Sequence, residues 1–120
     1  MATVKATLGL SSSNALLDTI NLSLTDTLTT TDPADVGRIT VLHSGATELA
    51  AASTGAHYTY IKNISSTNSK PVDIRTAGGT AYGQIATGEF AWIPAKVNLG
   101  IEVIAIDESV VVEYAIFKKG

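Results

Sequence analysis

The segment IEVIAIDESVVVEYAIF, residues 101–117, decides the fold. Two runs of alternating side chains flank the turn formers at 107–109, so the segment predicts a β-hairpin with strands over 101–106 and 110–117. Both strands are apolar on both faces, whereas a free-standing antiparallel sheet usually keeps one face polar. We therefore expect one face to pack into the protein's own core and the other to meet a second sheet or a partner molecule.

Alternation with a period of two dominates the rest of the chain and predicts an all-β protein. Strands are expected at residues 4–10, 20–28, 38–43, 57–64, 72–76, 82–86 and 89–93, with 47–53 either a short strand or a helical turn. Regularly spaced short strands separated by turn signals favour an antiparallel β-sandwich of the jelly-roll type. An immunoglobulin-like sandwich is the alternative, although its Cys–Trp–Cys framework is missing.

The length of 120 residues predicts a single sandwich domain over residues 1–120. Within it, residues 1–10 form an alternating strand at the N-terminus. We expect this strand to act as an exchanged or docking arm that adds to the sheet edge of a neighbour.

The composition argues against several classes of partner. A net charge of −3 gives no basic footprint for nucleic acid, and no apolar stretch is long enough to predict a membrane span or a signal peptide. Only 16% of residues are charged, and 16 Thr and 10 Ser are present instead. Such a surface loses little ionic hydration when it is buried against other proteins.

The residues that carry chemistry are sparse. The chain has no cysteine and two histidines, His43 and His57, which lie on separate segments without metal-ligand spacing and are expected on the surface or rim. No Gly-x-Ser-x-Gly nucleophile elbow occurs. We predict no catalytic residue, metal or cofactor; a small jelly-roll enzyme that uses His43, His57 and Glu89 is the competing hypothesis.

Aromatic residues alternate on two of the expected strands. Tyr58 and Tyr60 share one face of a strand, and Phe90 and Trp92 share one face of another. Aromatic rings in a small sandwich usually belong to its core, because each buries about 150–250 Å². Exposed on a sheet, the same rings would make a sugar-binding platform, which keeps a carbohydrate-binding module as an alternative function.

Four segments carry a resemblance to a known group of proteins. YTYIKNI (58–64), GEFAWIP (88–94), IEVIA (101–105) and VEYAIF (112–117) resemble strands of small virion structural proteins of tailed bacteriophages, notably those of cyanophages and other marine phages. The resemblance covers about the C-terminal half and includes no catalytic motif. It implies a β-sandwich that serves as a capsid decoration or cement protein, or as a neck or tail component.

These observations together predict a non-enzymatic virion structural protein, most simply a decoration or cement subunit that stabilises the phage head. Its partners would be the major capsid protein or other virion proteins, and copies of itself, with a trimer among the forms expected. It would be assembled in the cytoplasm of the bacterial host and reside in the virion. A neck, tail or fibre-associated subunit is the alternative. The candidate interface residues are Tyr58, Tyr60, Trp92, Ile104, Ile106, Val111 and Phe117.

Overall fold

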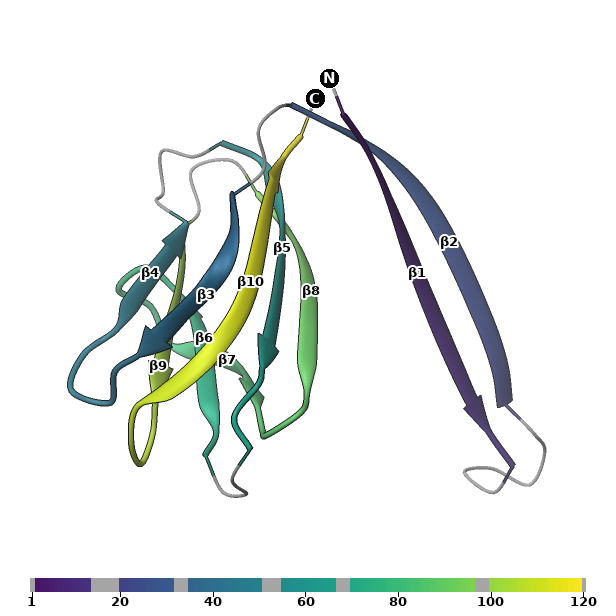
Figure 1. Cartoon of the computed structure of the whole chain (residues 1–120). Coiled ribbons are helices and arrows are strands. Elements are labelled where there is room, and N and C mark those ends of the chain that lie inside the picture. Colours follow the sequence, from purple (N-terminus) through teal and green to yellow (C-terminus); the bar gives the residue numbers. More distant parts are fainter. Residues whose placement is uncertain are drawn as a thin grey trace. The chain divides into compact units, whose positions relative to one another are not determined.

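The computed structural model describes residues 2–13, 20–31, 35–50, 55–66, 70–96 and 100–119. These residues form ten strands, β1 to β10, and no helix among them is long and apolar enough to cross a membrane. The strands divide into two compact units: β1 and β2 form one, and β3 to β10 form the other (Figure 1). The single domain over 1–120 stays a prediction, and the segment predicted as an exchanged or docking arm, residues 1–10, belongs to the smaller unit.

The N-terminal unit is a two-stranded antiparallel ribbon. β1 (Ala2–Ser12) pairs with β2 (Ile20–Thr30) over their whole length, with Leu8 opposite Leu24 and Leu10 opposite Leu22. Because side chains alternate along each strand, these leucines share one face of the ribbon with Val4, Ala6, Asp26 and Leu28. The opposite face carries Thr3, Lys5, Thr7, Thr25, Thr27 and Thr29. The ribbon is therefore amphipathic, and we call the first side its leucine face.

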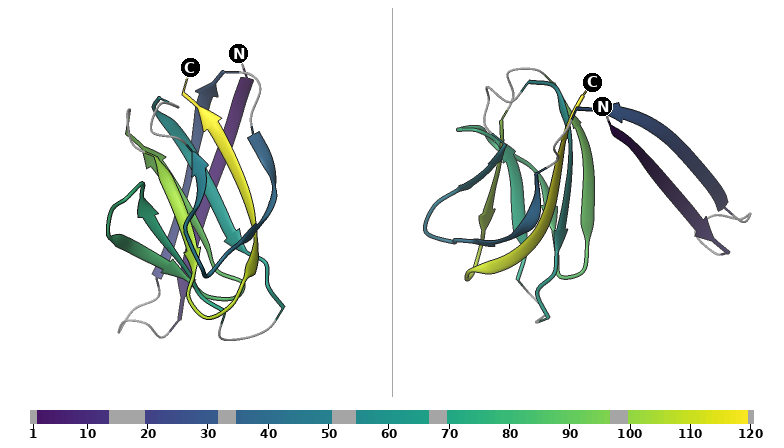
Figure 2. Two further views of the ribbon diagram at one scale, coloured as in Figure 1. Left: turned by 90° about the vertical axis from the view of Figure 1, so that its left-hand side faces the viewer. Right: turned by 45° about the horizontal axis from the view of Figure 1, so that its top comes forward.

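The second unit is a sandwich of two four-stranded antiparallel sheets (Figure 2). One sheet has the order β3 (Asp35–Val41), β10 (Val110–Lys118), β5 (His57–Asn63) and β8 (Phe90–Ala95). The other has the order β4 (Thr47–Ala50), β9 (Ile101–Ala105), β6 (Val72–Thr76) and β7 (Ala81–Ile85). The alternative left open for residues 47–53 is thus decided for 47–50, which form a strand.

The strand pairs are nested. β3 pairs with β10, β4 with β9, β5 with β8 and β6 with β7, so the chain follows the path of one long hairpin rolled up into two sheets. The turn at the centre of this hairpin lies between β6 and β7, where Gly78 adopts a φ of +70° and the Gly79 amide donates to the Thr76 carbonyl at 2.8 Å. This nested order is that of an eight-stranded jelly roll, as the sequence predicted.

The predicted hairpin over 101–117 is wrong. β9 pairs with β4 and β6, and β10 pairs with β3 and β5, so the two strands belong to different sheets. Residues 106–109 form the corner between the sheets. A tight hairpin turn and a corner between sheets use the same short polar residues, and both leave the alternation of the flanking strands intact.

The core lies between the two sheets and draws on both. Its buried side chains include Val41, Ile61, Val72, Ile74, Ile101, Val103, Val110, Val112 and Ile116. Alternation makes this possible: in β5 every second residue is buried, and in β9 Ile101, Val103 and Ala105 are. The sandwich therefore has its own hydrophobic core, built entirely from β3 to β10.

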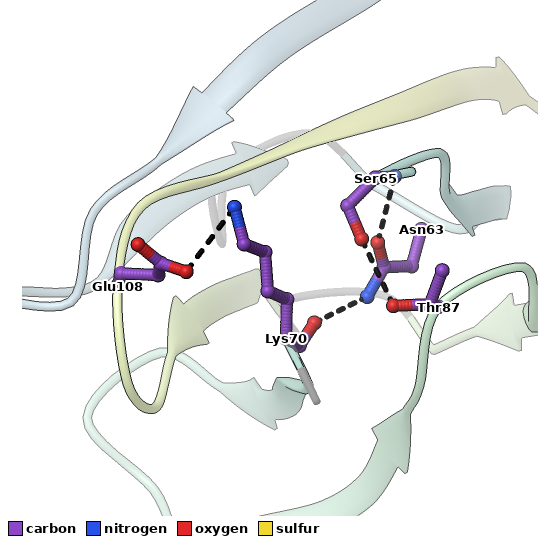
Figure 3. A network of polar contacts seen from close by, with 5 residues as sticks. All are labelled: Asn63, Ser65, Lys70, Thr87 and Glu108. Atoms are coloured by element: carbon purple, nitrogen blue, oxygen red, sulfur yellow. Dashed lines mark hydrogen bonds and ion pairs between the residues drawn. The ribbon is translucent and has the colours of Figure 1, made fainter. Parts of the chain in front are cut away.

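A polar network is buried at one end of this core (Figure 3). Asn63 is fully buried, and its side-chain amide donates to the carbonyls of Lys70 at 2.7 Å and Ile85 at 3.2 Å while its oxygen accepts from the Ser65 amide. Close by, the Lys70 ammonium lies 3.2 Å from a Glu108 carboxylate oxygen. The network fixes the loop after β5 to its neighbours, because it satisfies backbone groups that the strands leave unpaired.

Candidate interaction surface

The outward side chains of the β3–β10–β5–β8 sheet gather five aromatic rings. In β5 the inward residues are His57, Thr59, Ile61 and Asn63, so Tyr58, Tyr60 and Lys62 point outward. The register sets Tyr60 opposite Trp92, and Lys62 opposite Phe90, on β8. On the other side of β5, Phe117 of β10 lies opposite Tyr58. We call this surface, made of Tyr58, Tyr60, Phe90, Trp92 and Phe117, the aromatic face.

Three of these rings pack against one another. Tyr58 and Trp92 stack with centroids 5.5 Å apart and planes only 9° from parallel, and Trp92 meets Phe117 at 6.2 Å in a tilted arrangement. The ammonium of Lys119 lies 4.9 Å from the centroid of the Tyr58 ring, within the range of a cation–π interaction. The rings are thus held in place before any partner arrives, which lowers the entropy lost on binding.

A carboxylate sits beside the rings. Glu113 of β10 accepts a hydrogen bond from the Tyr60 hydroxyl at 3.2 Å and lies 3.4 Å from the Arg38 guanidinium of β3. Burial, and then the hydrogen bond and charge of Glu113, raise the pKa of Tyr60 above the ordinary value of a phenol. The phenol therefore stays protonated and continues to donate to Glu113 at neutral pH.

Large apolar side chains extend the aromatic face toward solvent. Phe90 is 61% exposed, and on the same outer side of the sheet Val36 is 64% and Val111 is 40% exposed. Single exposed apolar residues are ordinary on protein surfaces, but several on the same side of a sheet as packed aromatic rings are typical of an interaction surface.

The outer face of the opposite sheet is polar. Its outward residues include Glu48, Asp73, Arg75, Gln84 and Glu102. Arg75 lies 3.2 Å from Glu102, and the Gln84 amide donates to Asp73 at 2.7 Å. Water solvates such a surface without cost. The two outer faces of the sandwich therefore differ in chemistry, and the aromatic one has more apolar side chains that gain free energy when they are covered.

The structure places the predicted interface residues on two different sheets. Tyr58, Tyr60, Trp92, Val111 and Phe117 all lie on the outer side of the aromatic sheet. Ile104 lies on the polar sheet opposite Asp73, and Ile106 follows β9 at the corner between the sheets. The sequence grouped Ile104 and Ile106 with Val111 and Phe117 because it predicted a hairpin of β9 and β10, and it added Tyr58, Tyr60 and Trp92 as aromatic residues of other strands. The interface role itself remains a prediction.

Sequence reasoning missed three contributors to this surface: Val36, Arg38 and Glu113. The alternation of side chains along each strand could have identified them. Once the register between two paired strands is known, it shows which side chains of both strands lie on the same face of the sheet. The register between β3 and β10 joins segments far apart in the chain, and no local pattern specifies it.

The histidines do not form a site with Glu89. His57 is fully buried on the inner side of β5, where its Nδ1 is 2.9 Å from the Gly55 carbonyl oxygen, so its expected place on the surface or rim is wrong. His43 is exposed, and Glu89 accepts from the Ala86 amide in the turn before β8. Within the described part of the chain, no three His, Cys, Asp or Glu side chains gather as metal ligands would.

One depression lies at the edge of the sandwich. It has a volume of about 230 Å³, and its polar lining side chains are Thr76, Tyr82 and Lys96. Burial raises the pKa of Tyr82, so its phenol holds its proton at neutral pH. Among the described residues, its lining includes no carboxylate and no imidazole.

Comparison of the chain with protein-family models, curated proteins and solved structures found no match.

Proposed function

We propose that this protein is a structural subunit of a tailed-phage virion, with the head-decoration role as the form to test first. The observation that carries the proposal is the asymmetry of the sandwich: one outer face is charged and the other presents packed aromatic rings flanked by exposed apolar side chains. A subunit that works by burying area needs such a face and no catalytic centre.

Two further features support the same role. The ribbon carries a second apolar surface outside the core of the sandwich, and the segments that resemble phage structural proteins supply rings of the aromatic face, from residues 58–64, 88–94 and 112–117. A contact of about 800 Å² per partner, repeated by the symmetry of a capsid, stabilises a shell without any single strong bond.

A carbohydrate-binding module draws less support from the same rings. Sugar platforms offer open ring faces to the pyranose ring. Here Trp92 stacks on Tyr58, and Lys119 lies over the Tyr58 ring as well, so protein groups already contact that ring through its faces.

Co-sedimentation with empty heads tests the proposal, using heads built from the major capsid protein of the same genome. The wild-type chain should pellet with heads in a saturable manner. Phe90→Lys places a charge on the aromatic face at an exposed position and should weaken this binding by about tenfold or more.

Tyr82→Lys is the matched control, because Tyr82 is a similarly exposed aromatic residue of the opposite sheet. It should bind heads as the wild type does. Failure of the wild-type chain to pellet with heads at any concentration contradicts the decoration role; pelleting with tails alone moves the subunit to the tail.

A further inference from the structure

Four leucines of the leucine face have no layer within the ribbon to cover them. Leu8, Leu10, Leu22 and Leu24 are 44–67% exposed in the single chain, whereas Leu28 is buried. Two strands alone make one layer, and an isolated two-stranded hairpin is at best marginally stable in water. Stable pairing of β1 with β2 therefore requires a surface from outside the ribbon to pack on the leucines.

The aromatic face offers a surface of matching chemistry and size. The ribbon is about 37 Å long and two strands, or about 10 Å, wide, as its eleven residue pairs imply. The outer side chains of β5 and β8 form a strip that is also two strands wide. The neighbouring strand β10 has nine residues and is about 30 Å long, so the surface of these strands reaches a length of about 30 Å. Sheets that pack face to face in this aligned manner bury both inner surfaces.

The two surfaces carry charges of opposite sign that make no ion pair. Asp26 is the one charged residue at positions 4–10 and 22–28 of the leucine face, and Lys62 points outward beside the aromatic rings, next to Glu113, which pairs with Arg38. Neither Asp26 nor Lys62 makes an ion pair within the part of the chain that the structure describes. On one face of any strand, side chains recur every second residue, at intervals of about 6.7 Å. If β2 lies along β5 with Asp26 over Lys62, Leu24 therefore lies over Tyr60 and Leu22 over Tyr58.

We propose that the ribbon of one copy packs its leucine face on the aromatic face of a second copy, in a reciprocal exchange that joins two or more copies. The inference rests on the proposed structural role: the assembled oligomer is the form that binds heads, and Phe90→Lys weakens head binding because it disperses that oligomer.

Area favours exchange between copies. One ribbon on one face covers about 300 Å² on each side, because the length of the strip, about 30 Å, limits the overlap, and this area by itself is the size of a crystal contact. Two reciprocal ribbons bury about 1,200 Å² in total, which is the lower end of the range for a specific interface. A closed symmetric assembly is the arrangement in which every ribbon and every aromatic face is covered.

Zero-length cross-linking of isotopically mixed chains tests the partner. Equal amounts of ¹⁵N-labelled and unlabelled full-length chain are unfolded together in urea, refolded and treated with a carbodiimide, which joins a carboxylate to an adjacent amine. Peptides that join Asp26 to Lys62 should be found by mass spectrometry, and about half of them should pair one labelled with one unlabelled peptide, as random mixing of copies requires. Cross-links with matched labels only would mean that each ribbon covers its own sandwich, and they overturn the inference.

Sedimentation velocity of the same chain, without heads, tests the leucines. The wild type should form a closed oligomer, and Leu8→Ser with Leu24→Ser should raise its dissociation constant by about tenfold or more per leucine. Thr7→Ser with Thr25→Ser changes the facing pair on the opposite side of the ribbon and should leave the mass unchanged. A wild-type chain that remains monomeric at all concentrations overturns the inference.

A charge exchange provides a variant set that keeps every leucine. Asp26→Lys and Lys62→Asp should each weaken the oligomer, and the two together should restore it. Independent effects that add in the double variant contradict the proposed register.

If the chain oligomerises in this way but never pellets with heads, the inference stands and the decoration role fails. A chain that stays monomeric and still pellets with heads supports the decoration role and overturns the inference.

Discussion

Asn63 shows what one buried polar side chain contributes to this fold. Its amide donates to the carbonyls of Lys70 and Ile85, and its oxygen accepts from the backbone amide of Ser65; Figure 3 shows the bonds to Lys70 and Ser65. Asn63→Ala removes all three bonds and leaves buried groups without partners, which should lower the free energy of unfolding by about 3 kcal/mol. Urea denaturation measures the loss.

Gln84→Ala is the matched control for that measurement. Gln84 also carries an amide that makes a short hydrogen bond, but it does so to Asp73 on the exposed outer face of the opposite sheet. Its removal should cost less than about 0.5 kcal/mol. Equal losses for the two variants would contradict the role assigned to the buried network.

Tyr60 gives the stability of the protein a dependence on alkaline pH. Its pKa is raised in the folded state, first by burial and then by Glu113, so the folded state holds the phenolic proton more tightly than the unfolded chain does. The stabilisation is complete below the unfolded pKa near 10 and is lost as the pH rises through the folded pKa.

Tyr60→Phe should therefore flatten the fall in unfolding free energy above pH 10. Urea denaturation at pH 9 and at pH 11 measures the difference. Tyr82 also has a raised pKa, so Tyr60→Phe removes only part of the slope and Tyr82→Phe removes another part. A slope that Tyr60→Phe leaves unchanged would show that Glu113 does not hold the phenol in solution.

At the scale of elements, the turn between β7 and β8 depends on one glycine. Gly88 has a φ of +84° in the turn from Ala86 to Glu89, where the Glu89 amide donates to the Ala86 carbonyl at 3.0 Å. Gly88→Ala should destabilise the protein by about 1 kcal/mol, because a side chain is disfavoured at positive φ. Gly83→Ala in β7, where an added Cβ meets no atom within 4 Å, should be neutral or slightly stabilising by thermal denaturation.

The elements were largely predictable from the sequence, and their partners were not. Alternation located nearly every strand, because burial of one face imposes a period of two wherever a sheet packs on a core. The same reasoning failed at the corner over 106–109, where it predicted a hairpin. Alternation in the two flanking strands does not reveal whether they pair with each other or enter different sheets. Pro94 shows a similar limit: the strand predicted over 89–93 stops before it, yet it lies within β8, an edge strand that tolerates proline.

For the candidate surface, too, the sequence predicted the arrangement within each strand but not the contacts between strands. Alternation within β5 and within β8 placed Tyr58 and Tyr60 on one face of a strand and Trp92 on one face of another. Their meeting with Phe117 and Glu113 depends on pairings between segments more than 50 residues apart, as the Tyr60–Glu113 bond illustrates. Residues join across such distances through the topology of the jelly roll, which local sequence does not encode.

At the scale of the whole molecule, the two units differ in how they are held together. The sandwich encloses its own core, whereas the ribbon has one layer and leaves Leu8, Leu10, Leu22 and Leu24 of its leucine face exposed. Strands in such a ribbon exchange their amide hydrogens by local opening, and this opening becomes rarer when a second copy covers the leucines. The ribbon should therefore gain protection as the oligomer forms, and the core strands should not.

Hydrogen exchange of the full-length chain, followed by mass spectrometry at two concentrations on either side of the dissociation constant, measures this difference. Peptides from β1 and β2 should exchange about tenfold more slowly at the higher concentration, if most chains are then assembled. Peptides from the inner strands β9 and β6, which lie on the opposite sheet from the aromatic face, serve as the internal control and should exchange alike at both. Leu8→Ser with Leu24→Ser should abolish the concentration dependence in the ribbon alone. Ribbon protection that is strong and independent of concentration would mean that a single chain covers its leucines by itself, and exchange between copies would then have no driving force.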